Sequence, residues 1–149
     1  MPATLRDRLH SMLPEGRLLP DEVWHRRHRM IVRIALIQAG VRGVVALLRG
    51  ETAPVALLEA GGVALPLVMA VLLPGASRAL RAAAATLSLL AASMLLVYLM
   101  DGLTEAHFHF FVMVGVVSLY QDWVPFGVAL VVVVTHHGLV GALFPHSVF

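Results

Sequence analysis

The sequence contains no cysteine among its 149 residues, and every basic side chain is an arginine. The absence of cysteine excludes disulfide bonds, thiol redox chemistry and cysteine-ligated zinc, whatever the compartment of the protein. Serines are few and no glycine-rich turn joins a strand to a helix, so neither a nucleophilic triad nor a phosphate-binding loop can be assembled. We therefore expect that this chain is not an enzyme.

Charged residues are also scarce, at 13% of the chain, whereas hydrophobic residues make up 59% and the mean hydropathy is +0.85. So few polar side chains cannot coat a water-soluble globule of this length. The sequence therefore predicts an all-α membrane protein, a polytopic helix bundle whose first partner is the lipid bilayer. The net charge of +2 comes from arginines near the N-terminus, which fit anionic lipid headgroups better than nucleic acid.

Five apolar stretches are long enough, or nearly so, to cross a hydrocarbon core about 30 Å thick as helices. Short links with glycine, proline or aspartate separate them, and short links force neighbouring helices to run antiparallel. Together the stretches predict a transmembrane domain of residues 30–149, in which Asp122 caps the last helix. We place the spans at Met30–Leu48, Pro54–Leu73, Ala82–Met100, Leu103–Tyr120 and Pro125–Leu143.

Residues 1–29 form the only part of the chain with a soluble character, and we assign them to a separate N-terminal segment. Leu5, Leu9 and Leu13 recur at helical spacing and predict a short amphipathic helix. The following run 20–22, Pro-Asp-Glu, is typical of a helix start and leads into the first span through a basic stretch. No compact apolar core with a small-residue cleavage site follows, so the segment is not a secretory signal peptide.

Arginines are distributed unevenly over the two sides of the predicted bundle. Most precede or open the first span and two lie in the link between the second and third spans: Arg6, Arg8, Arg17, Arg26, Arg27, Arg29, Arg33, Arg78 and Arg81. By the positive-inside rule both regions are cytoplasmic. We therefore expect a bacterial inner membrane protein with a cytoplasmic N-terminus and an outer C-terminus. Tyr120 and Trp123 are then expected to be aromatic anchors at the inner interface.

Two ionisable side chains lie within the first and second spans at matching depth from the outer side, Arg42 and Glu59. Charges at membrane depth are costly and face the bundle interior, so each needs a partner. We predict that Arg42 and Glu59 form a structural ion pair that holds two helices in register. Gln38, one turn deeper than Arg42, is a candidate to join this pair or a ligand site.

A histidine cluster is predicted at the outer ends of the fourth and fifth spans. Glu105, His107 and His109 open the fourth span from outside, and His136 and His137 lie near the outer end of the fifth. At a rise of about 1.5 Å per residue, an antiparallel hairpin brings His109 and His136 to nearly the same depth. Because a helix turns about 100° per residue, His109 shares a face with Glu105, whereas His107 points away from both.

Neutral imidazole supplies a nitrogen lone pair that suits transition metals, and a nearby carboxylate can ligate or fix the ring tautomer. We predict a ligand site formed by His109 with His136 or His137, with Glu105 as ligand or support and His107 more peripheral. The candidate cofactors are a transition metal ion (copper, zinc, nickel or iron) and haem b. The competing interpretation is that these histidines only hydrogen-bond backbone carbonyls or headgroups.

The same residues resemble the multi-span sensory input region of bacterial signalling proteins, which stands ahead of diguanylate cyclase, histidine kinase or chemotaxis-receptor modules. The likeness is strongest in residues 102–113 (GLTEAHFHFFVM), 119–123 (LYQDW) and 135–138 (THHG), and it extends weakly to 24–29, 49–50 and 145–149. It implies a signal-receiving role for His146 and for the five residues of the predicted cluster, Glu105, His107, His109, His136 and His137. It also implies a histidine where this chain has Gln38, an additional span and a cytoplasmic output module.

The sequence thus predicts a membrane-embedded sensory input module that binds a transition metal or haem at its outer face and signals through helix packing. Its expected partner is a cytoplasmic output domain or protein, and a second copy of the chain is a further candidate. Two other classes compete with this hypothesis. One is a haem or metal redox or transport protein of the membrane, and the other is a membrane assembly subunit without a ligand.

Overall fold

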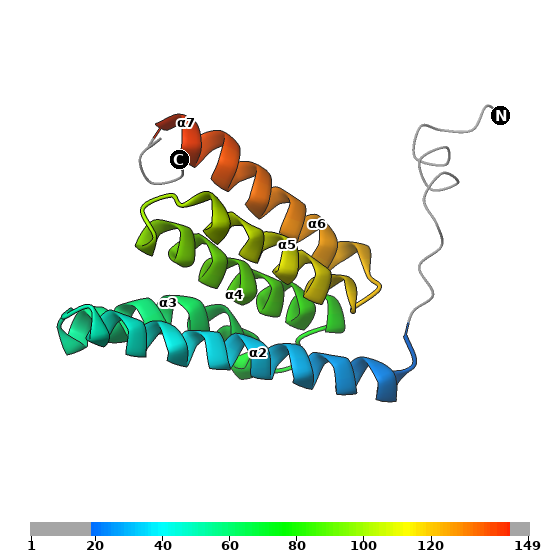
Figure 1. Cartoon of the computed structure of the whole chain (residues 1–149). Coiled ribbons are helices and arrows are strands. Elements are labelled where there is room, and N and C mark those ends of the chain that lie inside the picture. Colours follow the sequence, from blue (N-terminus) through cyan, green and yellow to red (C-terminus); the bar gives the residue numbers. More distant parts are fainter. Residues whose placement is uncertain (1–18, 144–149) are drawn as a thin grey trace, which may run out of the picture.

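The computed structural model describes residues 19–143, with backbone only at positions 70 and 140, and every element in that range is a helix (Figure 1). The predicted all-α bundle is therefore confirmed. Its elements are α2 (Asp21–Leu48), α3 (Ala53–Leu72), α4 (Arg78–Leu99), α5 (Thr104–Ser118), α6 (Trp123–Val134), the π-helix η1 (Thr135–Val140) and the short α7 (Gly141–Leu143). The predicted amphipathic helix within residues 1–18 and the candidate His146 lie outside the described residues.

Three helices are long and apolar enough to cross a membrane: Asp21–Leu48, Arg78–Leu99 and the continuous stretch Trp123–Leu143. In α3 the apolar part is shorter, Ala53–Met69, and α5 has 15 residues, or about 22 Å of helix. The bounds agree with the five predicted spans to within a few residues, except that α2 begins nine residues before Met30. It begins at Asp21, directly after Pro20, where the sequence has its helix-start signal.

Helix α4 is the centre of the bundle and contacts α2, α3, α5 and α6. In Figure 1, α2 and α3 lie on one side of it and α5 and α6 on the other. Small side chains, among them Ala82, Ala85 and Ala92, are fully buried on α4 and allow its neighbours to approach closely. Ser88 Oγ also donates a hydrogen bond of 2.6 Å to the carbonyl of Val63, which fastens α4 to α3.

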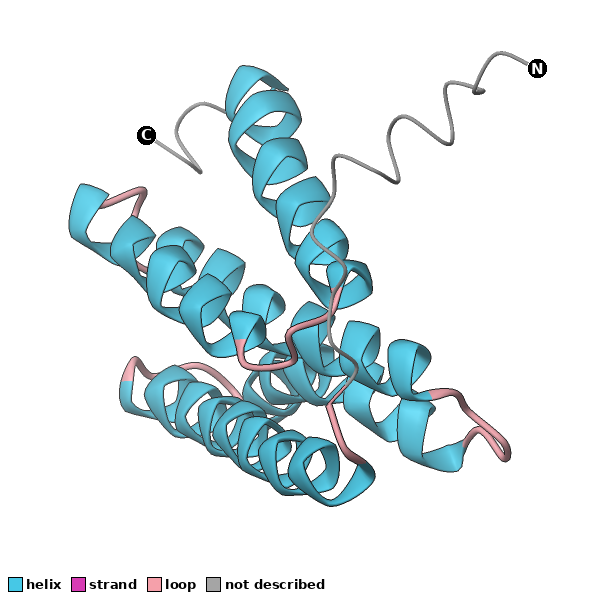
Figure 2. Ribbon diagram, turned by 90° about the vertical axis from the view of Figure 1, so that its right-hand side faces the viewer, coloured by secondary structure: helices cyan, strands magenta, loops and turns pink. Residues whose placement is uncertain are grey.

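Large apolar side chains cover the exterior of the helix bundle. Leu57, Leu58 and Phe111 are each more than 70% exposed, and exposed leucines, valines and phenylalanines occur on every long helix. Short links join neighbouring helices (Figure 2), as the sequence predicts. Asp122 caps α6 as expected, because its side chain accepts a hydrogen bond of 2.9 Å from the backbone N–H of Val124. A surface of this kind is stable in lipid rather than in water.

Candidate functional site

A buried hydrogen-bonded network joins α2, α4 and α5 around His109. The Nδ1 atom of His109 lies 2.7 Å from Ser93 Oγ, and its Nε2 lies 3.3 Å from Gln38 Nε2. Because the Gln38 amide can only donate at this nitrogen, His109 Nε2 accepts and Nδ1 carries the proton. Ser93 is then the acceptor for His109 and donates in turn to the carbonyl of Leu89, 3.3 Å away. The network therefore fixes one tautomer of His109.

Arg42 lies beside this network, one turn along α2 from Gln38. Its side chain is only 7% exposed, and its charge interacts electrostatically with both His109 and Glu59. Within the described residues, the two charged groups make no contact closer than 4 Å. Arg42 Nε and one carboxylate oxygen of Glu59 are buried without a hydrogen-bond partner there. The predicted pair is thus close enough to interact without forming a direct ion pair.

A second cluster joins the first turn of α5 to η1. The ring of His137 lies 5.2 Å from that of His107 and 5.2 Å from that of His136, measured between centroids. The Nδ1 atoms of His107 and His137 lie 3.1 and 3.0 Å from the carbonyls of Leu103 and Val133, to which they donate. In both rings the nitrogen that carries the lone pair is therefore Nε2. Phe110 packs against His136 at 5.2 Å and shields the cluster.

The pair His136 and His137 lies in the π-helix η1, between the α-helices α6 and α7. Short π segments inside α-helices are rare, and they occur frequently at functional sites. This local change of winding alters the faces on which side chains emerge, so the directions of the two rings cannot be derived from α-helical spacing. The segment thus presents His136 to the interior, where it is 6% exposed, and His137 towards His107.

The grouping of the predicted site residues differs from the expectation. The structure brings His107 together with His136 and His137, whereas it places His109 with Gln38 and Ser93. Glu105 lies on an exposed face of α5. The two histidines of α5 point to different neighbours, as their spacing requires, and it is the face of His107 and Phe110 that meets η1. Among residues 19–143, no three histidine or acidic side chains are arranged to hold a metal ion.

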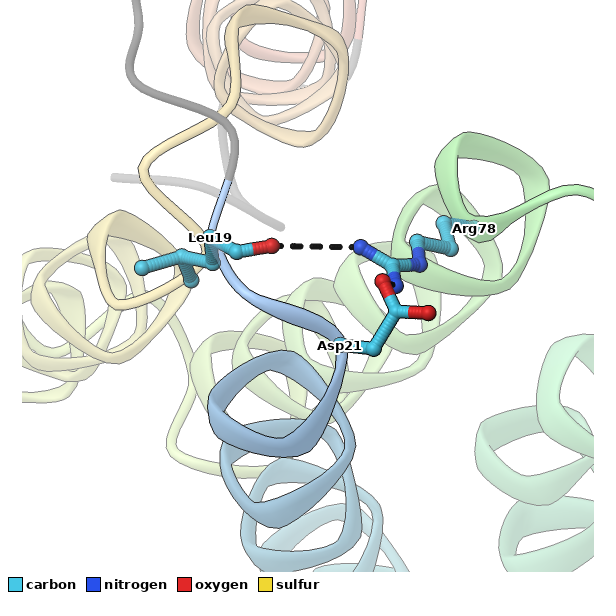
Figure 3. Close-up of polar contacts among 3 residues, drawn as sticks. All are labelled: Leu19, Asp21 and Arg78. Carbon is cyan, nitrogen blue, oxygen red and sulfur yellow. Dashed lines mark hydrogen bonds and ion pairs between the residues drawn. The ribbon is translucent and has the colours of Figure 1, made fainter.

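The end of the bundle at which α2 and α4 begin is held by a contact that the sequence did not predict. Arg78, at the start of α4, forms an ion pair with Asp21 and donates a hydrogen bond of 3.2 Å to the carbonyl of Leu19 (Figure 3). The same guanidinium lies 5.4 Å from the ring centroid of Trp24, at a distance typical of a cation–π interaction. These contacts fix the first turn of α2 against the first turn of α4.

Trp24 also connects α2 to the link between α5 and α6. Its ring stacks on His28 at 4.6 Å, and His28 Nδ1 is hydrogen-bonded to the Tyr120 hydroxyl at 2.7 Å. Arg27 donates to the carbonyl of Leu119 at 2.7 Å. Tyr120 is only 1% exposed, so its expected role as a lipid-facing anchor is wrong: its ring is buried against Trp24 and His28. Trp123, at 49% exposed, keeps the surface position that was expected.

Burial sets the charge state of this cluster around Trp24, which precedes the apolar stretch beginning at Met30. Burial, with a smaller contribution from the nearby charge of Arg81, lowers the pKa of His28 to about 4. Burial also raises the pKa of the Tyr120 hydroxyl. Both groups are therefore neutral at pH 7, and their contact is an ordinary hydrogen bond rather than an ion pair.

Comparison with known proteins gives one similarity that covers most of the chain. The transducer protein Htr8 of Halobacterium salinarum is 36% identical to it over 147 residues, which cover 91% of this chain and 23% of Htr8. The chain thus spans less than a quarter of the length of this curated relative. No protein-family model and no solved structure matches the chain. This membrane helix bundle is therefore similar to part of a transducer, which is a signalling protein.

Proposed function

We propose that the chain is the membrane-embedded sensory input module of a signal-transduction protein. The observation that carries the proposal is the polar network of Gln38, Ser93 and His109, with Arg42 beside it, inside an otherwise apolar bundle. Polar and ionisable groups at membrane depth are expensive, and they mark ligand, ion or proton sites more often than they stabilise a fold. The similarity to a transducer supports a signalling role over the redox, transport and assembly alternatives.

The arrangement of contacts suggests how a signal crosses the bundle. The network of His109 ties α2 to α4 and α5 in the outer half, whereas Trp24 and Arg78 tie α2 to α4 and the α5–α6 link at the inner end. A ligand that binds one packing of the outer half more tightly shifts the population towards that packing. Because α2 takes part in both sets of contacts, such a shift reaches the inner end, where a cytoplasmic output domain or partner would respond.

The pair of His107 and His137 is the best candidate for receiving the signal, as two of the ligands of a transition metal ion. Nε2 of His107 and of His137 carries the lone pair that a metal needs, and the carbonyls of Leu103 and Val133 hold the two rings in that tautomer. Haem fits His109 less well, because both of its ring nitrogens are engaged and Gln38 stands where the resemblance implies a histidine. The donor set therefore favours a metal ion.

Metal content tests this assignment. The detergent-extracted protein should carry close to one equivalent of copper, zinc, nickel or iron, and His107→Ala or His137→Ala should lower it at least tenfold. Elemental analysis measures the metal, and a visible spectrum of the same sample detects haem. His25→Ala is the matched control, because His25 is an exposed histidine at the opposite end. Equal metal in all four proteins, or none in the parent, would exclude the metal site.

The orientation of the bundle is a second part of the proposal, and the absence of cysteine makes it easy to test. We expect Thr104→Cys, at the outer start of α5, to react with a membrane-impermeant maleimide on intact cells, and Ser118→Cys, at its inner end, to remain unlabelled. Both side chains are exposed, so accessibility within the bundle is matched. Labelling of Ser118→Cys alone would place the N-terminus outside. Permeabilised cells, in which both variants should react, are the control.

A further inference from the structure

A groove of about 490 Å³ lies between α3 and η1, with α4 as its floor. Helix α3 contacts α4 closely, and α4 contacts α6, but α3 and η1 are separate walls of the groove. Most of the lining is apolar and includes Val63, Met94 and Leu95. The volume is within the range of about 300–1,000 Å³ that is usual for small-molecule sites. The groove opens on the exterior of the helix bundle, on a side that faces lipid in a membrane.

Two polar side chains face this groove from its two walls, Glu59 from α3 and His136 from η1. His136 is 6% exposed, and its Nε2 atom has no hydrogen-bond partner within the described residues. One carboxylate oxygen of Glu59 is likewise buried and unpaired there. A buried polar atom without a partner costs about 1–3 kcal/mol, so both atoms are poised to gain from a ligand that supplies hydrogen bonds.

A second, polar cavity of about 430 Å³ adjoins the groove at its outer end and shares Glu59 and Tyr98 with it. Arg49, Glu51 and Asp101 line this cavity, and all three are exposed residues of the outer links. Glu59 and Tyr98 therefore stand at the boundary between a polar entrance and an apolar groove. A ligand with a polar ring and an apolar tail fits such a gradient, with the tail directed into lipid.

The charges around the groove indicate what the ligand carries. An anionic ligand would be repelled by Glu59, and the neighbouring positive charge of Arg42 offsets the attraction of Glu59 for a cation. A purely apolar molecule would leave both buried polar atoms unpaired. We propose that the groove binds a neutral, lipid-soluble quinol, whose two ring hydroxyls can donate hydrogen bonds. One hydroxyl would donate to the carboxylate of Glu59 and the other would pair with Nε2 of His136, while the aliphatic walls hold the ring.

This inference goes beyond the proposed function and uses neither His107 nor His137, the two proposed metal ligands. Gly62 lines the groove, and a Cβ added there meets no atom within 4 Å, so a larger side chain at this position fills the groove without disturbing the fold. Gly61 is its matched control, because a Cβ there also meets nothing within 4 Å and Gly61 does not line the groove. Gly62→Leu and Gly61→Leu therefore differ mainly in whether they occupy the groove.

Photolabelling of the detergent-solubilised full chain with an azido-quinol, kept reduced during the experiment, tests the proposal. Labelling should fall within the peptides that contain Val63 and Met94, drop at least tenfold in Gly62→Leu, and remain within twofold of the parent in Gly61→Leu. His136→Leu, which keeps the wall apolar and removes one hydrogen bond, should weaken labelling several-fold. Metal content should be unchanged in Gly62→Leu, so a failure here is distinct from a failure of the metal site.

Three outcomes would overturn the assignment. Labelling that is unaffected by Gly62→Leu would place the quinol elsewhere, provided that the variant keeps the thermal stability of the parent. Equal loss in Gly61→Leu would indicate a general effect of the larger side chain on α3. Native mass spectrometry that finds phospholipid bound to the parent but not to Gly62→Leu, with no displacement by added quinol, would show that the groove holds an acyl chain instead.

Discussion

Glu59→Leu should destabilise the bundle by about 0.5–3 kcal/mol, the range for coupled neighbours rather than for a direct ion pair, because it removes an opposite charge that interacts with the buried guanidinium of Arg42. Arg42 is 7% exposed, whereas Glu59 is half-buried and faces two cavities. Arg42→Leu should therefore cost less, since the remaining carboxylate can be hydrated from the polar entrance. The double variant should recover most of the loss, because it replaces both charges by apolar groups. Thermal unfolding in detergent measures all three.

The control for this double-mutant cycle is a pair of exposed charges from the same helices and links, Arg33→Leu and Glu51→Leu. Neither should change the unfolding temperature by more than a degree or two, because exposed charges contribute little. If Glu59→Leu is as stable as the double variant, Arg42 does not depend on Glu59, and the buried charge is compensated elsewhere. A larger loss of stability in Glu59→Leu than in Arg42→Leu would show that the effect comes from the buried charge of Arg42. Simple loss of side-chain volume would not give this order, because arginine is the larger side chain.

Hydropathy and link chemistry predicted the helices well, because the length of an apolar stretch and the position of a cap are local properties of the chain. Asp122 was assigned as a cap from its position alone, and its side chain accepts from Val124 N–H. The start of α2 illustrates the limit of hydropathy. Its first nine residues are mostly polar, yet they continue the helix because Trp24 and His28 pack against Tyr120.

The partners of each histidine could not be predicted, because they depend on how the helices are rotated about their axes. The spacing of His107 and His109 showed that only one of them could face the fifth span. Which one depends on the packing of α5 against α4, where Ser93 offers a hydrogen bond that only the tertiary structure reveals. A small polar residue on an apolar helix, such as Ser93, was the sequence feature that could have indicated this contact, because such residues form hydrogen bonds between helices in membranes.

The π-helix η1 was not predicted either, because it lies inside an uninterrupted apolar stretch. The directions of the His136 and His137 side chains could therefore not be predicted from α-helical spacing. The sequence around His136 and His137 shows no proline, and α-helical spacing was assumed throughout. With the altered winding, one ring turns into the interior beside Phe110 and the other meets His107. The sequence predicted His109 beside this pair, whereas the structure places His107 there, and this grouping required the structure.

Trp24→Ala should destabilise the protein by about 3–5 kcal/mol, the cost of removing a large buried aromatic side chain. The ring is 4% exposed, stacks on His28, contacts Tyr120 and lies under the guanidinium of Arg78. Its loss would separate the first turn of α2 from α4 and from the α5–α6 link together. The measurement is thermal unfolding in detergent at pH 7, where the neutral states of His28 and Tyr120 are fixed by their shifted pKa values.

Trp123→Ala is the matched control for this change, because it removes the same side chain from the same end of the bundle at a position that is 49% exposed. It should cost well under half as much as Trp24→Ala. Tyr120→Phe, which removes only the hydroxyl bonded to His28, should cost about 1 kcal/mol and so separates the hydrogen bond from the packing. Equal losses in the two tryptophan variants would mean that Trp24 contributes no more than a surface ring, and that α2 is positioned mainly by other contacts, such as that of Gln38 with His109.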